Sequence, residues 1–357
     1  MFRFISALSF FFLAIAAYAS GPVAIQKADP TTAAFYKSGS SVYVTAGDTI
    51  IAGGVTCSYP SAVAVSLPTL VAGTDYQIVI DDGCDLDART YAASLATGEY
   101  RVGGFHFLPG SYPSDHNLGG NTTPTILEYS IWDVAFRPTC SPLGMSKIGH
   151  APEWLDIYFL GNSSNADGVS RNNDTILTGT NPPERADDFG GYGTSKYAKL
   201  NWWSANEFVA QWGKHLPSYS LMTRAAFGAQ EGKGRGNHPV TTGFATTNGA
   251  IMWSDQRFTG KFGQIQVIAS IWLWTSDFSD WEGTPATGPY GWDAYDVTEG
   301  RGQLILQNSD DLTALLFGGK SGYEEINGTR TTETIEKLWD NSVNIGIRGA
   351  CDHYTQF

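Results

Sequence analysis

Glycines frame the last part of this chain, and they constrain its fold more than any other feature. Gly318-Gly319 begins the frame, Gly328-Thr-Arg330 lies inside it, and Gly346-Ile-Arg-Gly-Ala-Cys-Asp-His353 closes it. The stretches between these landmarks, 323–327 and 331–344, are mostly polar and show little hydrophobic pattern. A rigid backbone around exposed side chains suits a binding surface, because exposed side chains can be exchanged at small cost in stability. We therefore predict a binding surface in this frame.

The composition is typical of a turn-rich β protein. The chain has 357 residues, 41 glycines, 13% aromatic residues and only 16% charged residues, which favours short strands, many turns and aromatic packing. This length allows two or three domains. The formal net charge of −13 argues against a nucleic-acid partner, because phosphate binding requires a surface rich in Lys and Arg.

Residues 1–19 have the pattern of a secretory signal peptide. One basic residue precedes an apolar run from Ile5 to Ala17, and Ala17-Tyr-Ala19 is a cleavage site with small residues. A retained membrane anchor is the alternative, but the apolar run is shorter than the roughly 20 residues of a membrane-spanning helix. No later segment has the hydropathy of a span, so we expect an exported, extracellular or cell-surface chain without a membrane span after cleavage.

Alternating strands and turns predict an antiparallel β-sandwich over residues 20–138. Ser41–Thr45, Tyr76–Ile80 and Thr125–Trp132 read as short extended segments separated by Gly, Asp and Pro. Arg137-Pro-Thr-Cys-Ser-Pro142 then marks a domain boundary. The fold class as a whole is α+β and mostly β.

Two helices are predicted in the second half of the chain. Ser204-Ala-Asn-Glu207 has the spacing of a capping box, so one helix begins there and ends at Gly213. A second helix begins near Ser218 or Ser220. Residues 264–274 read as a long strand. Two helices followed by a looped β region is the element order of a C-type-lectin-like domain, here over residues 139–357.

The order of these landmarks resembles the phage major tropism determinant family, the variable receptor-binding proteins of diversity-generating retroelements. The resemblance runs from about Ile25 to Tyr354. The strings that carry it, beside the terminal frame, are Gly103-Gly-Phe-His-Phe107, Gly119-Gly-Asn-Thr-Thr123, Glu128-Tyr-Ser-Ile-Trp-Asp133, Phe136-Arg-Pro138, Asp156-Ile-Tyr158, Pro239-Val-Thr-Thr-Gly243, Leu273-Trp-Thr275 and Gly300-Arg-Gly302.

The resemblance implies a protein that recognises a partner and catalyses no reaction. It implies a C-terminal ligand-binding domain, a homotrimer, and a cell-surface protein as receptor, with a glycan as the second choice. It also gives a virion tail as the alternative location. The family begins with a small β-prism domain that mounts it on the phage, whereas this chain begins with the signal pattern.

The resemblance places the receptor-facing positions inside the terminal frame, and two aromatic residues lie beside them. The matched positions are Lys320, Gly322, Glu324, Ile326, Glu333, Ile335, Glu336, Asp340, Ser342, Asn344 and Ile345, and the neighbouring aromatics are Tyr323 and Trp339. The set is acidic with aliphatic and aromatic members, so a basic or mixed protein patch would complement it.

Four cysteines allow three complete disulfide pairings. We favour Cys57 with Cys84, since both lie in the N-terminal domain, and we expect Cys351 to be a small buried apolar side chain. Arg348 and Asp352 are expected to form an ion pair. His106 and His353 are expected to make scaffold hydrogen bonds.

No catalytic, cofactor-binding or metal-binding residue is predicted. The segment from Trp202 to Pro217 is similar to formylglycine-generating enzymes, but these need a late cysteine pair and Cys351 alone follows Cys140. Gly318-Gly-Lys-Ser321 lacks the first glycine of a phosphate loop, since Ala314 stands there. Such an enzyme and a non-binding structural surface protein remain the alternatives to a receptor-binding protein.

Overall fold

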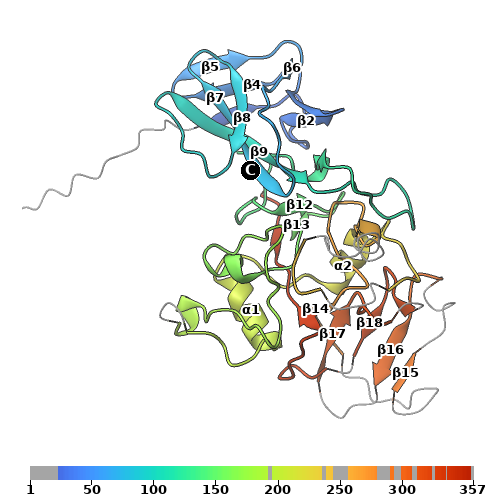
Figure 1. The fold of residues 1–357 in the computed structure, drawn as a ribbon. Helices are drawn as coiled ribbons and strands as arrows, with labels where there is room; N and C mark the ends of the chain where they lie inside the picture. Colours follow the sequence, from blue (N-terminus) through green and yellow to red (C-terminus); the bar gives the residue numbers. More distant parts are fainter. Residues whose placement is uncertain are drawn as a thin grey trace, which may run out of the picture.

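The computed structural model describes residues 23–191, 195–234, 239–243, 256–279, 290–292, 299–307, 312–323, 326–334 and 336–354. The predicted signal peptide lies outside these ranges. Figure 1 shows a group of strands from the first part of the chain stacked on a larger C-terminal part, with the chain end at their junction.

Three antiparallel sheets make up the N-terminal part. The first has the order β1-β4-β5 and the second β2-β3-β6, while the third has the order β10-β9-β7-β8 with β11 also paired to β9. Their strands are β1 (Ala24–Gln26), β2 (Phe35–Ser38), β3 (Ser41–Val44), β4 (Thr49–Ala52), β5 (Val55–Ser58), β6 (Val63–Ala64), β7 (Thr74–Asp81), β8 (Leu86–Thr90), β9 (Glu99–Leu108), β10 (Thr125–Ile126) and β11 (Trp132–Asp133).

One hydrophobic core joins these three sheets. Val42 of the second sheet, Ile50 of the first and Ile78 of the third are all fully buried in the same cluster. The alternation of buried and partly buried residues along β3 and β4 puts one face of each strand into this core. The expected antiparallel β fold is therefore confirmed for the N-terminal part.

Two sheets and two helices make up the C-terminal part. A small antiparallel sheet has the order β12-β13-β20, and a mixed sheet has the order β15-β16-β18-β17-β14-β19, in which β16 is parallel to β18 and β14 to β19. Their strands are β12 (Met145–Lys147), β13 (Glu153–Asp156), β14 (Trp272–Ser279), β15 (Tyr290–Trp292), β16 (Leu304–Gln307), β17 (Thr313–Phe317), β18 (Thr332–Glu333), β19 (Ile345–Gly346) and β20 (Ala350–Asp352). Three short 3-10 turns are η1 (Glu128–Ser130), η2 (Asn162–Asn165) and η3 (Asp187–Phe189).

Both predicted helices exist, and the start of the first differs from the prediction. Helix α1 spans Trp202–Ala210, and its cap is Asn201, whose side chain accepts from the backbone N–H of Ser204 at 3.0 Å. Ser204 is thus the returning member of the box, and its hydroxyl accepts from the Asn201 N–H. Helix α2 spans Tyr219–Ala225 and is capped by Ser218, as predicted. Within the described residues, no helix is both long and apolar enough to cross a bilayer.

The strand predicted over residues 264–274 begins only at Trp272. Gln266 and Ala269 have φ values of +56° and +59°, which interrupt any extended strand. The backbone N–H groups of this stretch instead donate to distant carbonyls, for example Ile265 to Ile157 and Val267 to Phe258. Tertiary partners therefore replace the strand that hydrophobicity alone predicts.

All four cysteines form disulfides. Cys57 pairs with Cys84, as predicted, and Cys140 pairs with Cys351. The expectation that Cys351 is an unbonded apolar side chain is therefore wrong, although the residue is buried. The second bond ties the start of the C-terminal part to β20, because Cys351 lies in that strand. β20 in turn pairs with β13.

A buried hydrogen-bond relay joins the two parts of the molecule. The ring of His106 on β9 lies 2.9 Å from Asp75 through Nδ1 and 2.9 Å from the Tyr158 hydroxyl through Nε2. Asp75 also accepts from the backbone N–H of Gly144. At the same junction Trp154 donates to Nδ1 of His353 at 3.0 Å. Both histidines therefore make the scaffold hydrogen bonds that we expect. The domain boundary at residue 138 stays a prediction.

Candidate functional site

A left-handed turn at Gly318 and Gly319 begins the candidate surface. Their φ values are +100° and +78°, a region that residues with a Cβ rarely adopt. A Cβ on Gly319 would lie 2.0 Å from the side-chain oxygen of Asn327. Asn327 is fully buried, and its amide donates to the carbonyls of Lys320 and Lys233 at 3.0 and 3.2 Å. Sterics and hydrogen bonds thus fix the direction in which Lys320 leaves the turn.

A buried arginine holds the other end of the frame. The guanidinium of Arg348 donates to the carbonyls of Asp156 at 3.1 Å and Ile157 at 2.7 Å, and also to that of Ile265. Burial lowers the pKa of Arg348 to about 9, so the group stays charged at neutral pH. The predicted ion pair with Asp352 is wrong, since Asp352 is exposed on β20 while Arg348 is fully buried.

A buried ion pair lies next to Arg348. Lys214 donates to the carboxylate of Asp156 at 2.6 Å, and the backbone N–H of Gly349 donates to the other carboxylate oxygen at 2.7 Å. Burial raises the pKa of Asp156, and Lys214 opposes this by stabilising the charged form. The hydrogen-bonded pair fastens the end of the frame to β13 and to the residues that follow α1.

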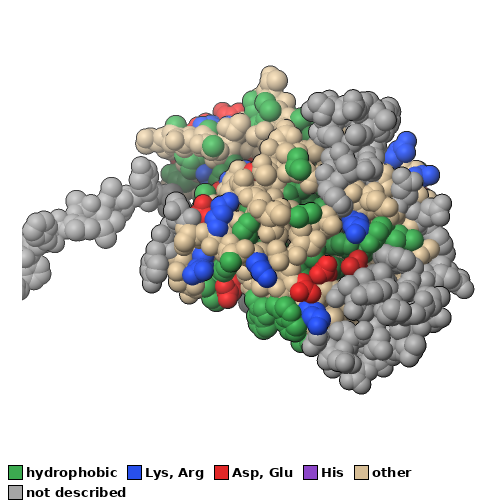
Figure 2. Space-filling view, turned by 60° about the horizontal axis from the view of Figure 1, so that its bottom comes forward, with side chains coloured by type: hydrophobic (Ala, Val, Ile, Leu, Met, Phe, Trp, Pro, Cys, Tyr) green, Lys and Arg blue, Asp and Glu red, His purple; other side chains and the backbone are tan. Residues whose placement is uncertain are grey.

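Between these two anchors, most of the predicted binding residues reach the surface at least in part. We call the following set the terminal surface: Lys320, Gly322, Tyr323, Ile326, Glu336, Trp339, Asp340, Ser342 and Asn344. Trp339 is the most prominent apolar member, with half of its side chain exposed. Glu324 and Ile335 lie outside the described residues. Figure 2 shows hydrophobic, acidic and basic side chains close together at this end of the molecule.

Two predicted contact residues lie inside the domain and not on its surface. Ile345 on β19 is fully buried in the core cluster that also holds α1, since β19 pairs with β14. Glu333 on β18 is only 6% exposed. The family resemblance implies that both residues face the receptor, but the pairing of their strands in the mixed sheet turns their side chains inward.

The carboxyl group of Glu333 is electrostatically unusual. One of its oxygens has no hydrogen-bond partner in the described part of the chain. Burial raises the pKa of Glu333 to about 7, and Glu336 adds to the rise while Lys320 opposes it. The pKa of Glu336 is raised as well, mainly by burial and then by Asp340. Glu333 and Glu336 therefore hold protons more tightly than isolated glutamate carboxyl groups do.

Cations lie on aromatic rings within the terminal surface. Nζ of Lys320 lies 4.3 Å from the ring centroid of Tyr323, and that ring packs edge-on against Trp272 at 6.2 Å. Nζ of Lys337 lies 5.5 Å from the ring of Trp339. These contacts limit the rotamers of the aromatic side chains, which lowers the entropy that a partner would have to remove on binding.

Sequence reasoning missed an aromatic patch that adjoins the terminal surface, consisting of Trp203 and Phe278. Trp203 is 54% exposed and Phe278 is 44% exposed, and both rings lie 4.9 Å from the buried ring of Trp202. The backbone N–H of Trp202 donates to the carbonyl of Leu338, directly before Trp339. The Trp202-Trp203 pair is visible in the sequence, but which of the two rings is exposed depends on the residue at which α1 begins.

The described residues offer little support for the enzymatic alternative. They contain no group of three or more His, Cys, Asp or Glu side chains arranged to hold a metal. Cys140 and Cys351 are bonded to each other, and no cysteine of the chain is free. The thiol chemistry of formylglycine-generating enzymes therefore has no free thiol here.

Comparisons with known proteins agree with this geometry. A family model described as the Mtd second domain matches residues 33–133. The tail fiber receptor-binding protein of Bordetella phage BPP-1 is 35% identical over 340 residues, covering 92% of this chain and 84% of that protein. The structure of the Major Tropism Determinant U1 variant superposes with a TM-score of 0.78 at 33% identity, covering 93% of this chain and 86% of that one. The M1 variant gives a TM-score of 0.79 at 33% identity, covering 94% and 87%.

Proposed function

This chain belongs to the major tropism determinant family, and on that premise we propose that it is a receptor-binding protein that uses the terminal surface together with the aromatic patch. The observation that carries the proposal is the contrast between frame and surface. Arg348, Asn327 and the Asp156–Lys214 pair are buried and hydrogen-bonded, while the residues of the terminal surface reach solvent at least in part. Such a scaffold tolerates changes in its exposed side chains.

The proposed receptor is a cell-surface protein with basic groups around an apolar centre. Glu336 and Asp340 give the surface its acidic side chains, and Trp339, Trp203 and Phe278 give it exposed aromatic area. Aromatic residues contribute most to interface affinity when a partner desolvates them. Acidic groups at the edge speed the encounter with a basic partner and help select it.

We further propose that the chain acts as a homotrimer and lies outside the cell, either on a virion tail or as an exported protein. Several copies of one weak site on a single particle raise the total affinity without new contacts. Two disulfides fit an oxidising compartment. The tail fiber protein to which the chain is similar favours the virion tail.

The test is binding of the purified chain to an array of bacterial surface proteins. We compare it with a variant in which Lys320, Glu336, Trp339 and Asp340 are changed to Ala. A control variant changes Val63, Val71 and Leu95 to Ala, because these residues are also exposed but lie in the N-terminal part.

We expect saturable binding by the chain and by the control, and a loss of at least tenfold in affinity for the terminal variant at unchanged melting temperature. Equal binding by all three proteins would mean that recognition does not use the four changed residues of the terminal surface. The absence of any saturable binding would favour a structural surface protein.

A further inference from the structure

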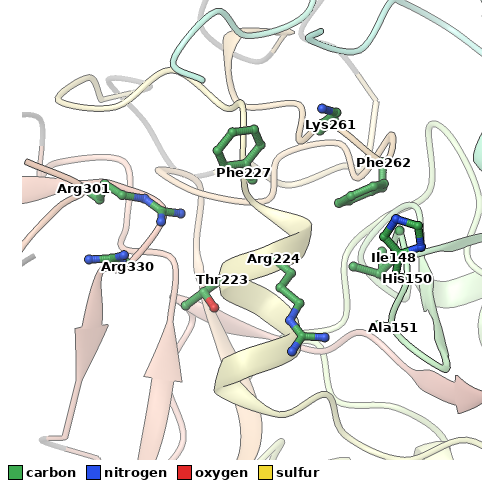
Figure 3. Close-up of a pocket in the computed structure, with 11 residues that line it drawn as sticks. Ile148, His150, Ala151, Thr223, Arg224, Phe227, Lys261, Phe262, Arg301 and Arg330 are labelled. Atoms are coloured by element: carbon green, nitrogen blue, oxygen red, sulfur yellow. The ribbon is translucent and has the colours of Figure 1, made fainter. Parts of the chain in front are cut away.

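A cavity of about 620 Å³ lies beside the C-terminal end of α2, away from the terminal surface. Its wall comes from α2, from the loop at residues 148–151, from residues 261–262 and from the segments that hold Arg301 and Arg330. Figure 3 shows Arg301 and Arg330 on one side of the helix end, and Lys261, Phe262 and His150 on the other. The volume lies within the range of small-ligand sites.

The cavity is basic in a chain that is strongly acidic. Arg224, Lys261, Arg301 and Arg330 line it, and none of the described lining residues is Asp or Glu. The chain has only 22 Lys and Arg residues and a formal net charge of −13. Composition alone therefore does not explain four cations around one cavity.

Two of the four cations, Arg301 and Arg330, have carboxylate partners, and both partners lie outside the lining. Glu231 lies 3.7 Å from Nε of Arg301, and Glu299 lies 3.3 Å from Arg330. In the described part of the chain, neither Arg224 nor Lys261 has a carboxylate within ion-pair distance. The cavity therefore keeps a surplus of positive charge that an anion would neutralise.

Two of the four cations lie over one aromatic ring. Nζ of Lys261 lies 5.6 Å and the guanidinium carbon of Arg301 lies 5.9 Å from the ring centroid of Phe227. Burial lowers the pKa of Arg301, and the charge of Arg330 adds to the fall while Glu231 opposes it. Phe262 is fixed edge-on against Tyr129 at 4.9 Å. The site thus combines guanidinium forks, which match carboxylate and sulfate oxygens, with apolar ring surfaces.

A second cavity continues the first toward the N-terminal part. It has a volume of about 830 Å³ and shares Gly149, His150, Lys261 and Phe262 with the first. Lys37 and Lys147 add to its lining, and Glu128 is its one carboxylate among the described residues. Cations spaced along two joined cavities suit a chain of charged units better than a single compact anion.

We propose that these joined cavities form a second binding site, which takes an anionic saccharide carrying carboxylate or sulfate groups. Arg224 and Lys261 bind the acidic group, and Phe227 and Phe262 contact the apolar faces of the sugar rings. This site is independent of the terminal surface and of the receptor proposed for it.

Isothermal titration of the full chain with a matched set of sugars tests the proposal. The probes are lactose, 3′-sulfated lactose and 3′-sialyllactose, with a pentaglutamate peptide for the peptide alternative. The test variant carries Arg224→Gln and Lys261→Gln, which remove the charge and leave a shorter polar side chain at each position. The control carries Arg185→Gln and Lys199→Gln, which remove the same charge outside the cavities.

We expect both anionic sugars to bind the chain and the control at least tenfold more tightly than lactose does, and the test variant to lose this preference. The variant of the terminal surface should bind the sugars normally, so failure of one proposal is distinguishable from failure of the other. Lack of binding by every probe, equal binding of lactose, or tighter binding of pentaglutamate would overturn the saccharide site. A change in oligomer size of the test variant by light scattering would also overturn it, since the cations would then contact a second copy.

Discussion

Glu333 shows how a single residue can make the stability of this fold depend on pH. Its pKa is about 7 in the folded chain against an ordinary value of 4.5. The folded state therefore binds the proton more tightly than the unfolded state does. The stability that this proton contributes is fully present below pH 4.5 and is lost as the pH rises through 7.

Replacing Glu333 with Gln should remove this dependence. At pH 8 we expect E333Q to be more stable than the unmodified chain by on the order of 3 kcal/mol, because the buried charge is gone. At pH 4.5 the two proteins should differ little. Urea unfolding at several pH values measures the difference, and subtraction cancels the shared titration of Asp156. Parallel stability curves for the two proteins would contradict the assignment.

At the scale of elements, the start of α1 decides which side chains face the surface. The box formed by Asn201 and Ser204 places Trp202 in the core and Trp203 in solvent. We expect Asn201→Ala to cost about 1 kcal/mol of stability, because the N–H of Ser204 loses its acceptor. Asn206→Ala, inside the same helix, is the control and should change stability by less than about 0.5 kcal/mol. Urea midpoints that shift equally for both variants would argue against Asn201 as the cap.

The same helix shows how far sequence reasoning reaches. Ser204 and Glu207 have the spacing of a capping box, and so do Asn201 and Ser204, so local pattern alone cannot choose between them. Burial of Trp202 against Phe278 and the bond from its backbone to Leu338 decide the outcome, and these partners are distant in sequence. The helices, the antiparallel N-terminal sheets and the Cys57–Cys84 bond follow from local patterns. The partners of Arg348, the inward turn of Glu333 and Ile345, and the loop at residues 264–271 depend on long-range contacts.

For the whole molecule, the bond between Cys140 and Cys351 closes the largest loop, with a sequence separation of 211 against 27 for the other disulfide. Removing a disulfide that closes a longer loop gives a larger increase in the conformational entropy of the unfolded chain. We expect the double change of Cys140 and Cys351 to Ala to cost about 2–5 kcal/mol, and more than the double change of Cys57 and Cys84. Urea unfolding followed by tryptophan fluorescence compares the two variants. A smaller cost for the longer loop would show that strain or residual structure outweighs chain entropy.

β20 follows the terminal surface in the sequence, and this order has a consequence for how the protein folds while it is made. β13 cannot complete its sheet, and Arg348 cannot reach its three carbonyls, until residues 348–352 have left the ribosome. The terminal surface is encoded just upstream of these residues. A stop codon or frameshift within residues 320–345 therefore removes the closing strand together with Cys351 and leaves a hydrophobic core exposed. Reading-frame errors in residues 320–345 therefore become folding failures.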